Sequence, residues 1–585
     1  MASTTTSPKA EAIVESFKKK LNRQAVLAHA TCVHCGMCNE SCHYFLATGD
    51  PKMTPAYKVD QVRKLFKYHV DWLGKLVPGW VGGKTLKTDE DLEELKDVVY
   101  GSCSMCRRCT IACPFGGDTA LLMRTARGLL TAQGLAPEGV QVVSKDQWEI
   151  GNQMGVSKED YLETIEWLQD ELRGEVGDPA AEIPIDKEDA DVLFLVNPRE
   201  VKYAPLSLVA AAKIFYVAGE NWTLPSEGWD NTNFGLFSGD DALGAHMGNL
   251  AYEQARKLRA KKVVISECGH GFRATKWEAP NWAKEDLPFP MESFLETMVH
   301  YVNSGKITLD PTANTKPVTY HDPRNLSRSA GITEEPRFLL KKACLDFREM
   351  TPNRAESFCC SGGGGAMSMS EYAPRRLQVA SVKADQIKAT SAEAVATACH
   401  NCVDGLSDLI KHYKINIPVR NVCEFVADAT VMKAPLFAPA EIPAAMLGKT
   451  VLVIEDDPDT VTYLTAIFED HGLSTTFARN AADGLAKARQ DQPDLITLDI
   501  NMPGRSGADV FKRLRSDPAT ASIPVCVITG AIDFRDLMYH RNVPPPDGYL
   551  QKPIEPALLM MTARKILELI HHKKKPAGVE ATVEV

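Results

Sequence analysis

The strongest constraint on this chain is a cysteine spacing that occurs twice near its amino terminus. Each run reads Cys-x2-Cys-x2-Cys-x3-Cys, which wraps three thiolates around one iron–sulfur cube and gives the fourth to a neighbouring cube. Zinc is the alternative, but it does not explain a third and a fourth cysteine in each run. We therefore predict one [4Fe–4S] cluster on Cys32, Cys35, Cys38 and Cys113, and a second on Cys103, Cys106, Cys109 and Cys42.

The length and composition describe an ordinary globular protein of several domains. The chain has 585 residues, of which 44% are hydrophobic and 24% charged, and this length predicts three or four domains. Sixteen cysteines are too few for a secreted disulfide scaffold, and their spacing favours metal centres in a reducing cytoplasm. The net charge of −10, without a long basic stretch, argues against nucleic acid as a partner.

Neither a signal peptide nor a membrane span is expected from the sequence. Residues 1–8 are polar and lack an apolar core. The most apolar stretch, residues 206–219, is too short to cross a bilayer and contains Lys213. If the protein serves a membrane, we expect it to do so through another subunit.

A second cysteine motif lies in the middle of the chain. Cys359 and Cys360 are adjacent and precede a run of four glycines, residues 362–365, which would let the backbone approach a metal centre. Cys399 and Cys402 follow a later strand-like run. Four thiolates at a glycine-lined strand end indicate an iron–sulfur centre that meets a substrate. A redox dithiol and a zinc site are the alternatives.

With these motifs the chain resembles the CCG-domain iron–sulfur proteins related to heterodisulfide reductase. Within that family the closest likeness is to the DsrK group, and the TmcB and HmcF subunits are similar in layout. The resemblance covers roughly residues 25–425. It is carried by the first cysteine run, residues 42–51, Cys106-Arg-Arg-Cys109, Glu267-Cys-Gly-His270 and Phe358-Cys-Cys360.

The resemblance implies an iron–sulfur oxidoreductase in a redox complex at the cytoplasmic face of the inner membrane. A membrane haem-b subunit would exchange electrons with quinone, and a small DsrC-like protein would carry the disulfide substrate. A third [4Fe–4S] centre, non-cubane in that family, would be held by the catalytic cysteines Cys359, Cys360, Cys399 and Cys402.

One position departs from the family pattern. Arg324 follows His-Asp-Pro, where the family has a fifth cysteine. Cys268, the equivalent position in the preceding half, would fill the place if a pseudo-twofold axis brings the two strand ends together. His270, His321 and His400 are other candidate neighbours, and each is equally well explained by a structural hydrogen bond. Arg324 is interpreted either as a surface residue or as the partner of a bound anion, and an ordinary cube is the alternative to a non-cubane centre.

The last part of the chain alternates strand-like and helix-like runs whose strands end in polar residues. These residues are Glu455, Asp456, Asp499, Thr529 and Lys552. Because parallel strands end at one edge of a sheet, we expect these side chains to share a pocket. Carboxylates in such a pocket would hold Mg²⁺.

This region resembles a response-regulator receiver domain over its whole length. The resemblance implies that Asp499 accepts a phosphoryl group from a histidine kinase. Glu455 and Asp456 would hold Mg²⁺ together with Asp499 and the Asn501 carbonyl. Thr529 and Lys552 would sense the phosphoryl group and Tyr549 would change rotamer. A receiver fold kept only for docking is the alternative.

The predicted fold is therefore a multidomain α/β protein. It comprises an α-helical ferredoxin domain (residues 1–180), a duplicated CCG α/β domain (190–425), a Pro/Ala-rich linker (426–448), a flavodoxin-like (βα)5 receiver domain (449–570) and a disordered tail (571–585). We expect an oxidoreductase acting on a thiol or disulfide. The alternatives are an electron relay without a substrate and a phosphorylation-controlled redox sensor.

Overall fold

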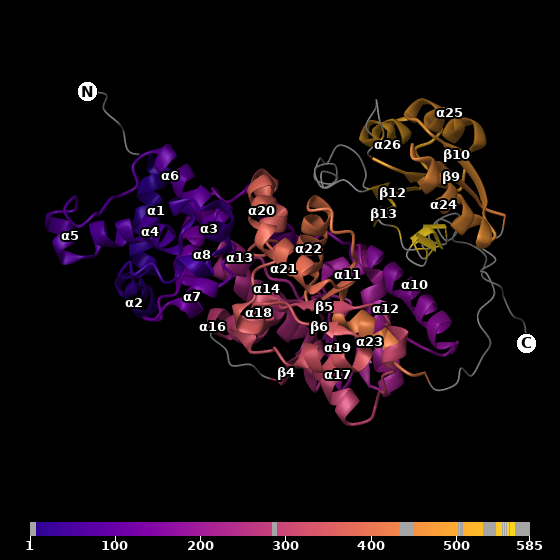
Figure 1. Cartoon of the computed structure of the whole chain (residues 1–585), viewed down its shortest axis with the longest axis horizontal. Coiled ribbons are helices and arrows are strands. Elements are labelled where there is room, and N and C mark those ends of the chain that lie inside the picture. Colours follow the sequence, from indigo (N-terminus) through magenta and orange to yellow (C-terminus); the bar gives the residue numbers. More distant parts are fainter. Residues whose placement is uncertain are drawn as a thin grey trace, which may run out of the picture. The chain divides into compact units, whose positions relative to one another are not determined.

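The computed structural model divides into two compact units, one of residues 1–176 with 180–434 and one of residues 177–179 with 435–585 (Figure 1). It describes residues 7–567 with gaps at 284–288, 433–445, 447, 501, 503–506, 530–545, 553, 555, 557–558, 561 and 565. Part of the expected linker (426–448) and all of the expected tail (571–585) lie outside these residues. No helix among them is long and apolar enough to cross a bilayer.

The amino-terminal part of the first unit is helical, as expected. Residues 9–29 form two helices, because the chain turns at Leu21 and Asn22 and the Asn22 side chain caps the second helix. Ile13 and Phe17 are fully buried, so this region has a core face. The helices are α1 Pro8–Lys20, α2 Arg23–Thr31, α3 His43–Thr48, α4 Pro55–His69, α5 Trp72–Leu76, α6 Asp89–Lys96, α7 Arg108–Ala112, α8 Thr119–Thr131, α9 Glu138–Glu149 and α10 Lys158–Val176.

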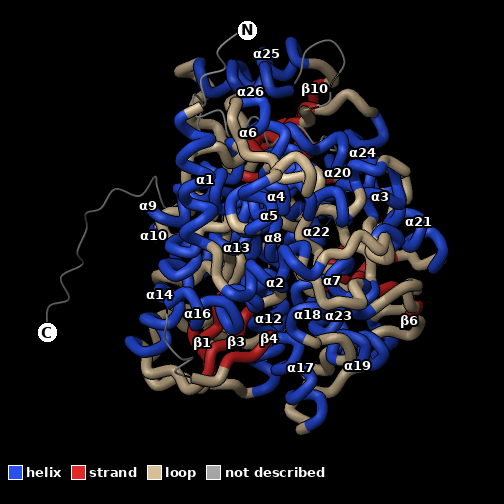
Figure 2. Tube along the Cα trace, turned by 90° about the vertical axis from the view of Figure 1, so that its left-hand side faces the viewer, coloured by secondary structure: helices blue, strands red, loops and turns tan. Residues whose placement is uncertain are grey.

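The next part contains a parallel four-stranded sheet of order β2-β1-β3-β4. All four residues of β1 are buried, which is typical of a parallel strand covered on both faces. Figure 2 shows β1, β3 and β4 side by side. The elements are β1 Val192–Leu195, α11 Pro198–Lys202, α12 Pro205–Ala218, β2 Trp222–Thr223, α13 Gly235–Ser238, α14 Asp241–Lys257, β3 Lys262–Ile265, α15 Gly269–Arg273, α16 Ala279–Ala283, β4 Met291–Ser293 and α17 Phe294–Asn303.

A second sheet repeats this topology with the order β6-β5-β7-β8. In both sheets the third strand is followed by a helix that begins directly after a cysteine, Cys268 in the first sheet and Cys399 in the second. The elements are β5 Val318–His321, α18 Arg324–Ala330, α19 Glu335–Ala343, β6 Phe347–Arg348, α20 Ala373–Val379, α21 Ser381–Thr390, β7 Ala394–Thr397, α22 His400–His412, β8 Val419–Asn421 and α23 Val422–Ala429.

The second unit has a parallel sheet of order β10-β9-β11-β12-β13, the arrangement of a CheY-like receiver. The strand order reverses between β9 and β11, so the ends of these two strands lie next to each other. The described elements are β9 Thr450–Ile454, α24 Pro458–Asp470, β10 Ser474–Ala478, α25 Ala481–Asp491, β11 Leu495–Leu498, α26 Gly507–Ser516, β12 Val525–Thr529 and β13 Gly548–Gln551.

Candidate metal centres and thiol site

The first predicted set of four cysteines lines one cavity. Cys32, Cys35, Cys38 and Cys113 surround a space of about 520 Å³, whose wall also contains apolar residues such as Val59. The backbone N–H of Gly117 donates to the Cys113 Sγ at 3.2 Å. The side chain of Cys35 is exposed. This cavity therefore reaches the protein surface.

The second set lines another cavity, of about 370 Å³, with Cys42, Cys103, Cys106 and Cys109 in its wall. The buried Lys58 ammonium lies 3.4 Å from the Cys42 Sγ. Cys109 also borders the first cavity, so the two cavities are neighbours.

Both cavities fit iron–sulfur cubes by the chemistry of their donors. Each offers four thiols from the predicted sets. N–H groups point at the sulfurs, as for Met105 N to Cys103 Sγ at 3.4 Å, and hydrogen bonds to sulfur tune the potential of such clusters. One cavity holds a lysine ammonium beside a thiol, which stabilises an anionic cluster more than a neutral group would.

The loop of the second cavity touches the central cysteine motif. Ser104, between Cys103 and Cys106, donates its hydroxyl to the Cys359 Sγ at 3.6 Å. Gly364 adopts a positive φ of 73°, and a Cβ there would lie 2.6 Å from the Ser104 carbonyl oxygen. Only glycine therefore permits this close approach of the two loops.

Arg127 of α8 ties the same loops together from within the core. It is fully buried, and its guanidinium donates to four carbonyl oxygens, those of Val99 (2.8 Å), Phe237 (3.1 Å), Gly364 (2.6 Å) and Cys103 (2.6 Å). Since these carbonyls belong to the helical part and to both α/β halves, one cation fixes all three against one another.

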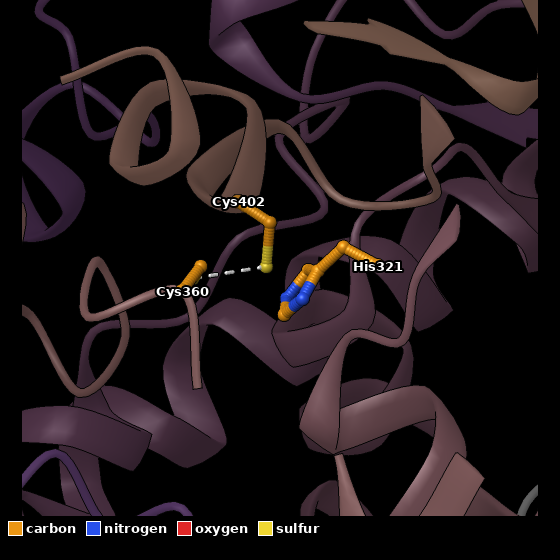
Figure 3. Close-up of side chains that lie close together, drawn as sticks. All are labelled: His321, Cys360 and Cys402. Atoms are coloured by element: carbon orange, nitrogen blue, oxygen red, sulfur yellow. Dashed lines mark hydrogen bonds between the residues drawn. The ribbon is translucent and has the colours of Figure 1, made fainter. Parts of the chain in front are cut away.

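The central cysteines form a buried thiol pocket at the carboxyl ends of β5 and β7, where the strand order of their sheet reverses. The Cys360 and Cys402 sulfurs lie 3.3 Å apart, and His321 points at both (Figure 3). Possible ligand atoms of these three residues lie within 4.8 Å of one another. Burial lowers the pKa of His321 to about 3, so its imidazole is neutral and able to bind a metal.

The first sheet brings Cys268 to the same place. Its thiol lies 3.4 Å from the His270 Nδ1, and the backbone N–H of His400 donates to the Glu267 carbonyl oxygen. Burial raises the pKa of Cys268, and the neighbouring Cys399 adds to this rise. The two strand ends therefore meet, as the pseudo-twofold arrangement required.

The three candidate histidines have different surroundings. His321 faces the thiols and His270 contacts Cys268. His400 instead lies 3.4 Å from the buried carboxylate of Glu200 and beside Asn421. Of the two interpretations of these histidines, the structural hydrogen bond is therefore the one that fits His400.

Arg324 is not a surface residue, so that interpretation is wrong. Its side chain is only 7% exposed, and its Nη1 lies 3.4 Å from the Cys359 Sγ. A Cβ on Gly363 would lie 1.6 Å from the same nitrogen, so glycine leaves room for the guanidinium. Helix α18 begins at Arg324, directly after Pro323 at the N-cap position.

Sequence reasoning missed several residues of the site. Ser104 lies between two motif cysteines and Arg127 lies within helix α8. Their roles come from contacts with residues far away in the sequence, Cys359 for Ser104 and Gly364 for Arg127. Lys383 of α21 is buried, and burial lowers the pKa of its ammonium to about 8, which nearby Asp322 opposes. No local pattern distinguishes these residues from exposed counterparts.

In the second unit, Glu455, Asp456 and Asp499 place carboxylate oxygens within 4.8 Å of one another. Lys552 donates to the Glu455 carboxylate at 2.7 Å and to the Asp499 carboxylate at 2.6 Å. Burial raises the pKa of Glu455 to about 7. Asn501 lies outside the described residues, and the described parts of Thr529 and Tyr549 are their backbones on β12 and β13.

Three protein families match separate parts of the chain: the 4Fe-4S dicluster domain over residues 28–116, the cysteine-rich CCG domain over 318–406, and the response regulator receiver domain over 451–564. The CCG match covers β5, β6 and β7 of the second sheet but not β8, and it includes no strand of the first sheet, whose topology is nevertheless the same.

Curated relatives match parts of the chain that correspond to these families. An Hdr-like menaquinol oxidoreductase iron-sulfur subunit of Archaeoglobus profundus is 29% identical over 479 residues, covering 72% of this chain and 84% of the relative. One subunit of the dihydromethanophenazine:CoB–CoM heterodisulfide reductase of Methanosarcina mazei is 27% identical over 418 residues, covering 70% and 96%. Protein PilH of Pseudomonas aeruginosa is 35% identical over 117 residues, covering 20% and 96%.

Proposed function

This chain is a heterodisulfide reductase-like iron–sulfur oxidoreductase whose C-terminal domain belongs to the response regulator receiver family, and on that premise we propose that it is the catalytic subunit of a thiol/disulfide redox complex. The observation that carries the proposal is the contact between Ser104 and Cys359. It places the wall of the second cysteine cavity directly against the thiol pocket.

The ligand sets follow from the cavities. Cys32, Cys35, Cys38 and Cys113 would hold an outer cluster, and Cys42, Cys103, Cys106 and Cys109 an inner one. The outer cavity has the exposed Cys35, whereas the inner one adjoins Cys359. When bound, these clusters would supply one-electron transfer between a partner at the surface and the buried thiols.

The buried pocket would hold a third [4Fe–4S] centre on Cys359, Cys360, Cys399 and Cys402. His321 and Cys268 are the further donors that its surroundings provide. Arg324 takes the place of the family's fifth cysteine. A non-cubane centre would therefore need Cys268 or His321 as its fifth donor, and without either of them the four thiols would hold an ordinary cube.

The reaction is the reversible cleavage of a disulfide. Two electrons and two protons convert one S–S bond into two thiols, and the reverse direction returns them. Cys359 is the thiol that both Arg324 and Ser104 contact. The buried Lys383 ammonium, whose pKa is influenced by the charges of Asp322, Cys360 and Cys359, would deliver a proton.

The partners follow from the family. The Archaeoglobus relative is named a menaquinol oxidoreductase subunit, which supports a complex with a membrane haem-b subunit that reacts with quinone. The protein would then lie at the cytoplasmic face of the inner membrane. The likeness to the DsrK group supports a small DsrC-like protein as the disulfide substrate.

The receiver would control this activity through phosphorylation of Asp499. Glu455, Asp456 and Asp499 are close enough to hold Mg²⁺ together with the Asn501 carbonyl. Lys552 already bridges two of these carboxylates and would contact the phosphoryl group, with Thr529 and Tyr549 responding to the added charge. A histidine kinase is the implied phosphoryl donor.

The domain limits that we propose are a ferredoxin part (1–180), a duplicated CCG part that begins near 190, and a receiver (449–570). Helix α23 extends to Ala429, and an isolated bridge pairs Thr430 with Leu309. These contacts support an end of the second half a few residues beyond the expected position 425.

The test is disulfide cleavage by the reduced full-length protein under anaerobic conditions. We expect the wild-type chain to release thiol from a suitable disulfide, Cys360→Ser to release none, and Cys344→Ser to behave as wild type. Cys344 is a buried cysteine outside both motifs, so it controls for the loss of a thiol. The proposal fails if no disulfide yields thiol, or if Cys360→Ser retains the wild-type rate.

A further inference from the structure

Apolar side chains are exposed together at one tip of the helical part, in the insert between the two cysteine runs. The tip consists of residues 71–83, which form α5 and the turn after it. Trp80 is 85% exposed, Trp72 73% and Leu76 71%. Figure 1 shows α5 at the edge of the helical part, beyond α4. Two tryptophans and a leucine exposed within nine residues indicate an interaction surface.

The backbone of the tip is fixed, because it packs against the end of α4. A Cβ on Gly74 would lie 1.8 Å from the Lys67 carbonyl oxygen, and a Cβ on Gly83 would lie 3.1 Å from the Tyr68 nitrogen. These two glycines therefore allow the tip to lie directly along the helix. The tryptophans are thus presented by a preformed structure.

The backbone N–H groups of the tip find acceptors within the tip itself. The Asp71 carboxylate accepts from the N–H groups of Leu73 and Gly74 at 2.9 and 3.0 Å. Three more backbone bonds close the turn after α5: Val77 to Leu73, Trp80 to Val77 and Gly83 to Pro78. Because the interior of a lipid layer offers no hydrogen-bond partners, backbone enters it at low cost only when it is already paired. This backbone meets that condition.

Lysines surround the tip although the chain as a whole is acidic. Residues 64–87 contain five lysines and one carboxylate, whereas the net charge of the chain is −10. That carboxylate, Asp71, caps α5. The acidic residues that follow lie on α6, where Asp91 pairs with Lys84 at 2.7 Å. Three of the lysines have no carboxylate within ion-pair distance in the described part of the chain: Lys67, Lys75 and Lys87. Their charges suit an anionic surface.

We propose that this tip inserts into the surface of a membrane that contains anionic lipid, so that the protein contacts the bilayer itself and not only a partner subunit. Trp72 and Trp80 would lie at the level of the lipid head groups, where tryptophan is favoured. Lys75 on α5 would extend its ammonium to the lipid phosphates while its methylene groups stay beside the apolar side chains. The inference does not depend on the thiol chemistry.

This attachment would hold the outer cysteine cavity close to the membrane. The tip packs on the carboxyl end of α4, and Val59 from the amino-terminal half of the same helix lines the cavity. The part of α4 beyond Val59 spans about 15 Å at 1.5 Å per residue. A cluster in that cavity would therefore lie near a redox partner embedded in the same membrane.

The test measures flotation of the anaerobically purified full-length protein with two kinds of vesicle. One kind is phosphatidylcholine alone, and the other is a mixture of phosphatidylethanolamine and phosphatidylglycerol. We expect the protein to bind the anionic vesicles about ten- to hundredfold more tightly, because each lysine near an anionic surface contributes about fivefold. Brominated lipids should quench the tryptophan fluorescence, which shows that the tip enters the bilayer.

Variants locate the binding at the tip. Trp72→Ser combined with Trp80→Ser should lower the affinity by about a hundredfold, since each large apolar side chain that leaves water contributes about tenfold. Lys67→Gln combined with Lys75→Gln should weaken binding to the anionic vesicles by about tenfold. Trp277→Ser removes another exposed tryptophan, 52% exposed, and should change neither. The visible spectrum shows whether each variant carries its clusters.

Each other outcome would overturn the proposal. Equal binding to both kinds of vesicle would exclude recognition of anionic lipid, and wild-type binding by the double tryptophan variant would place the contact elsewhere. Absence of vesicle binding would leave a protein as the occupant of the tip, and self-association that the tryptophan variant loses would identify a second copy of the chain.

The same variants separate this inference from the proposed function. The double tryptophan variant should release thiol from a disulfide in solution at the wild-type rate, because the tip is not part of the thiol pocket. Thiol release without vesicle binding would overturn the membrane tip alone. Vesicle binding without thiol release would overturn the proposed function alone.

Discussion

Arg127 offers the sharpest test of how the three parts of the first unit are joined. Replacing it with methionine keeps most of the side-chain volume and removes the guanidinium. Four carbonyl oxygens then lose their donor: those of Val99, Phe237, Gly364 and Cys103. We therefore expect the substitution to destabilise the whole unit rather than one helix.

The size of the effect follows from the contacts. Each charge-assisted hydrogen bond contributes about 1.5–3 kcal/mol, but the variant no longer has to bury a guanidinium. Breaking a buried charged network costs about 3–5 kcal/mol. We expect Arg127→Met to lower the free energy of unfolding by about 4 kcal/mol.

Tryptophan fluorescence is a suitable assay. All eight tryptophans of the chain lie in the first unit, so anaerobic unfolding in guanidinium chloride reports on that unit alone. Arg259→Met, at an exposed position, serves as the control and should leave the unfolding curve unchanged. If Arg127→Met unfolds within about 1 kcal/mol of the wild type, Arg127 does not join the parts in the way we describe.

The remaining predictions concern a buried histidine, a buried lysine and the receiver. His29 is buried with both ring nitrogens unpartnered, and burial lowers its pKa to about 4. Its neutral imidazole therefore contributes fully to the free energy of unfolding above the unfolded pKa of about 6.5, and this contribution is lost as the pH falls toward 4. Between pH 7.5 and 5 the free energy of unfolding of the wild type should fall by about 2 kcal/mol more than that of His29→Phe, and equal losses in denaturant unfolding would contradict this. Lys58→Met removes a cation 3.4 Å from the Cys42 Sγ. Because a nearby cation favours the reduced, more negative cluster, its loss should lower the reduction potential of the inner cluster by the equivalent of on the order of 3 kcal/mol per electron. A redox titration followed by paramagnetic resonance measures this shift, and an unchanged potential would place that cluster elsewhere. Asp499→Asn should abolish labelling by acetyl phosphate with Mg²⁺ on a phosphate-affinity gel, whereas Asp483→Asn should not, and labelling of Asp499→Asn would mean another phosphoacceptor.

Local patterns predicted much of the fold and many of the candidate ligands. The cysteine spacing separated the eight amino-terminal thiols into two sets, and each set lines its own cavity. Buried runs that end in polar residues predicted the α/β parts, and the pseudo-twofold arrangement explained why Cys268 approaches Cys399. These features depend on period, spacing and strand order, which the sequence carries locally.

The missed features depend on contacts between distant segments. Arg324 is a charged residue on a short helix, and no local pattern shows that it faces Cys359. Ser104 meets Cys359 although they are 255 positions apart in the chain. Buried arginines such as Arg127 are interpreted as surface residues by default, because their burial becomes acceptable only when several carbonyl groups converge on them.

The most direct test of the account is the metal content of the full-length protein purified without oxygen. Two cubes and a third centre on the proposed ligand sets require about twelve irons with matching sulfide, and removal of the third centre by Cys360→Ser should leave about eight. A colourless preparation that contains zinc and little iron would contradict the assignment of all three centres.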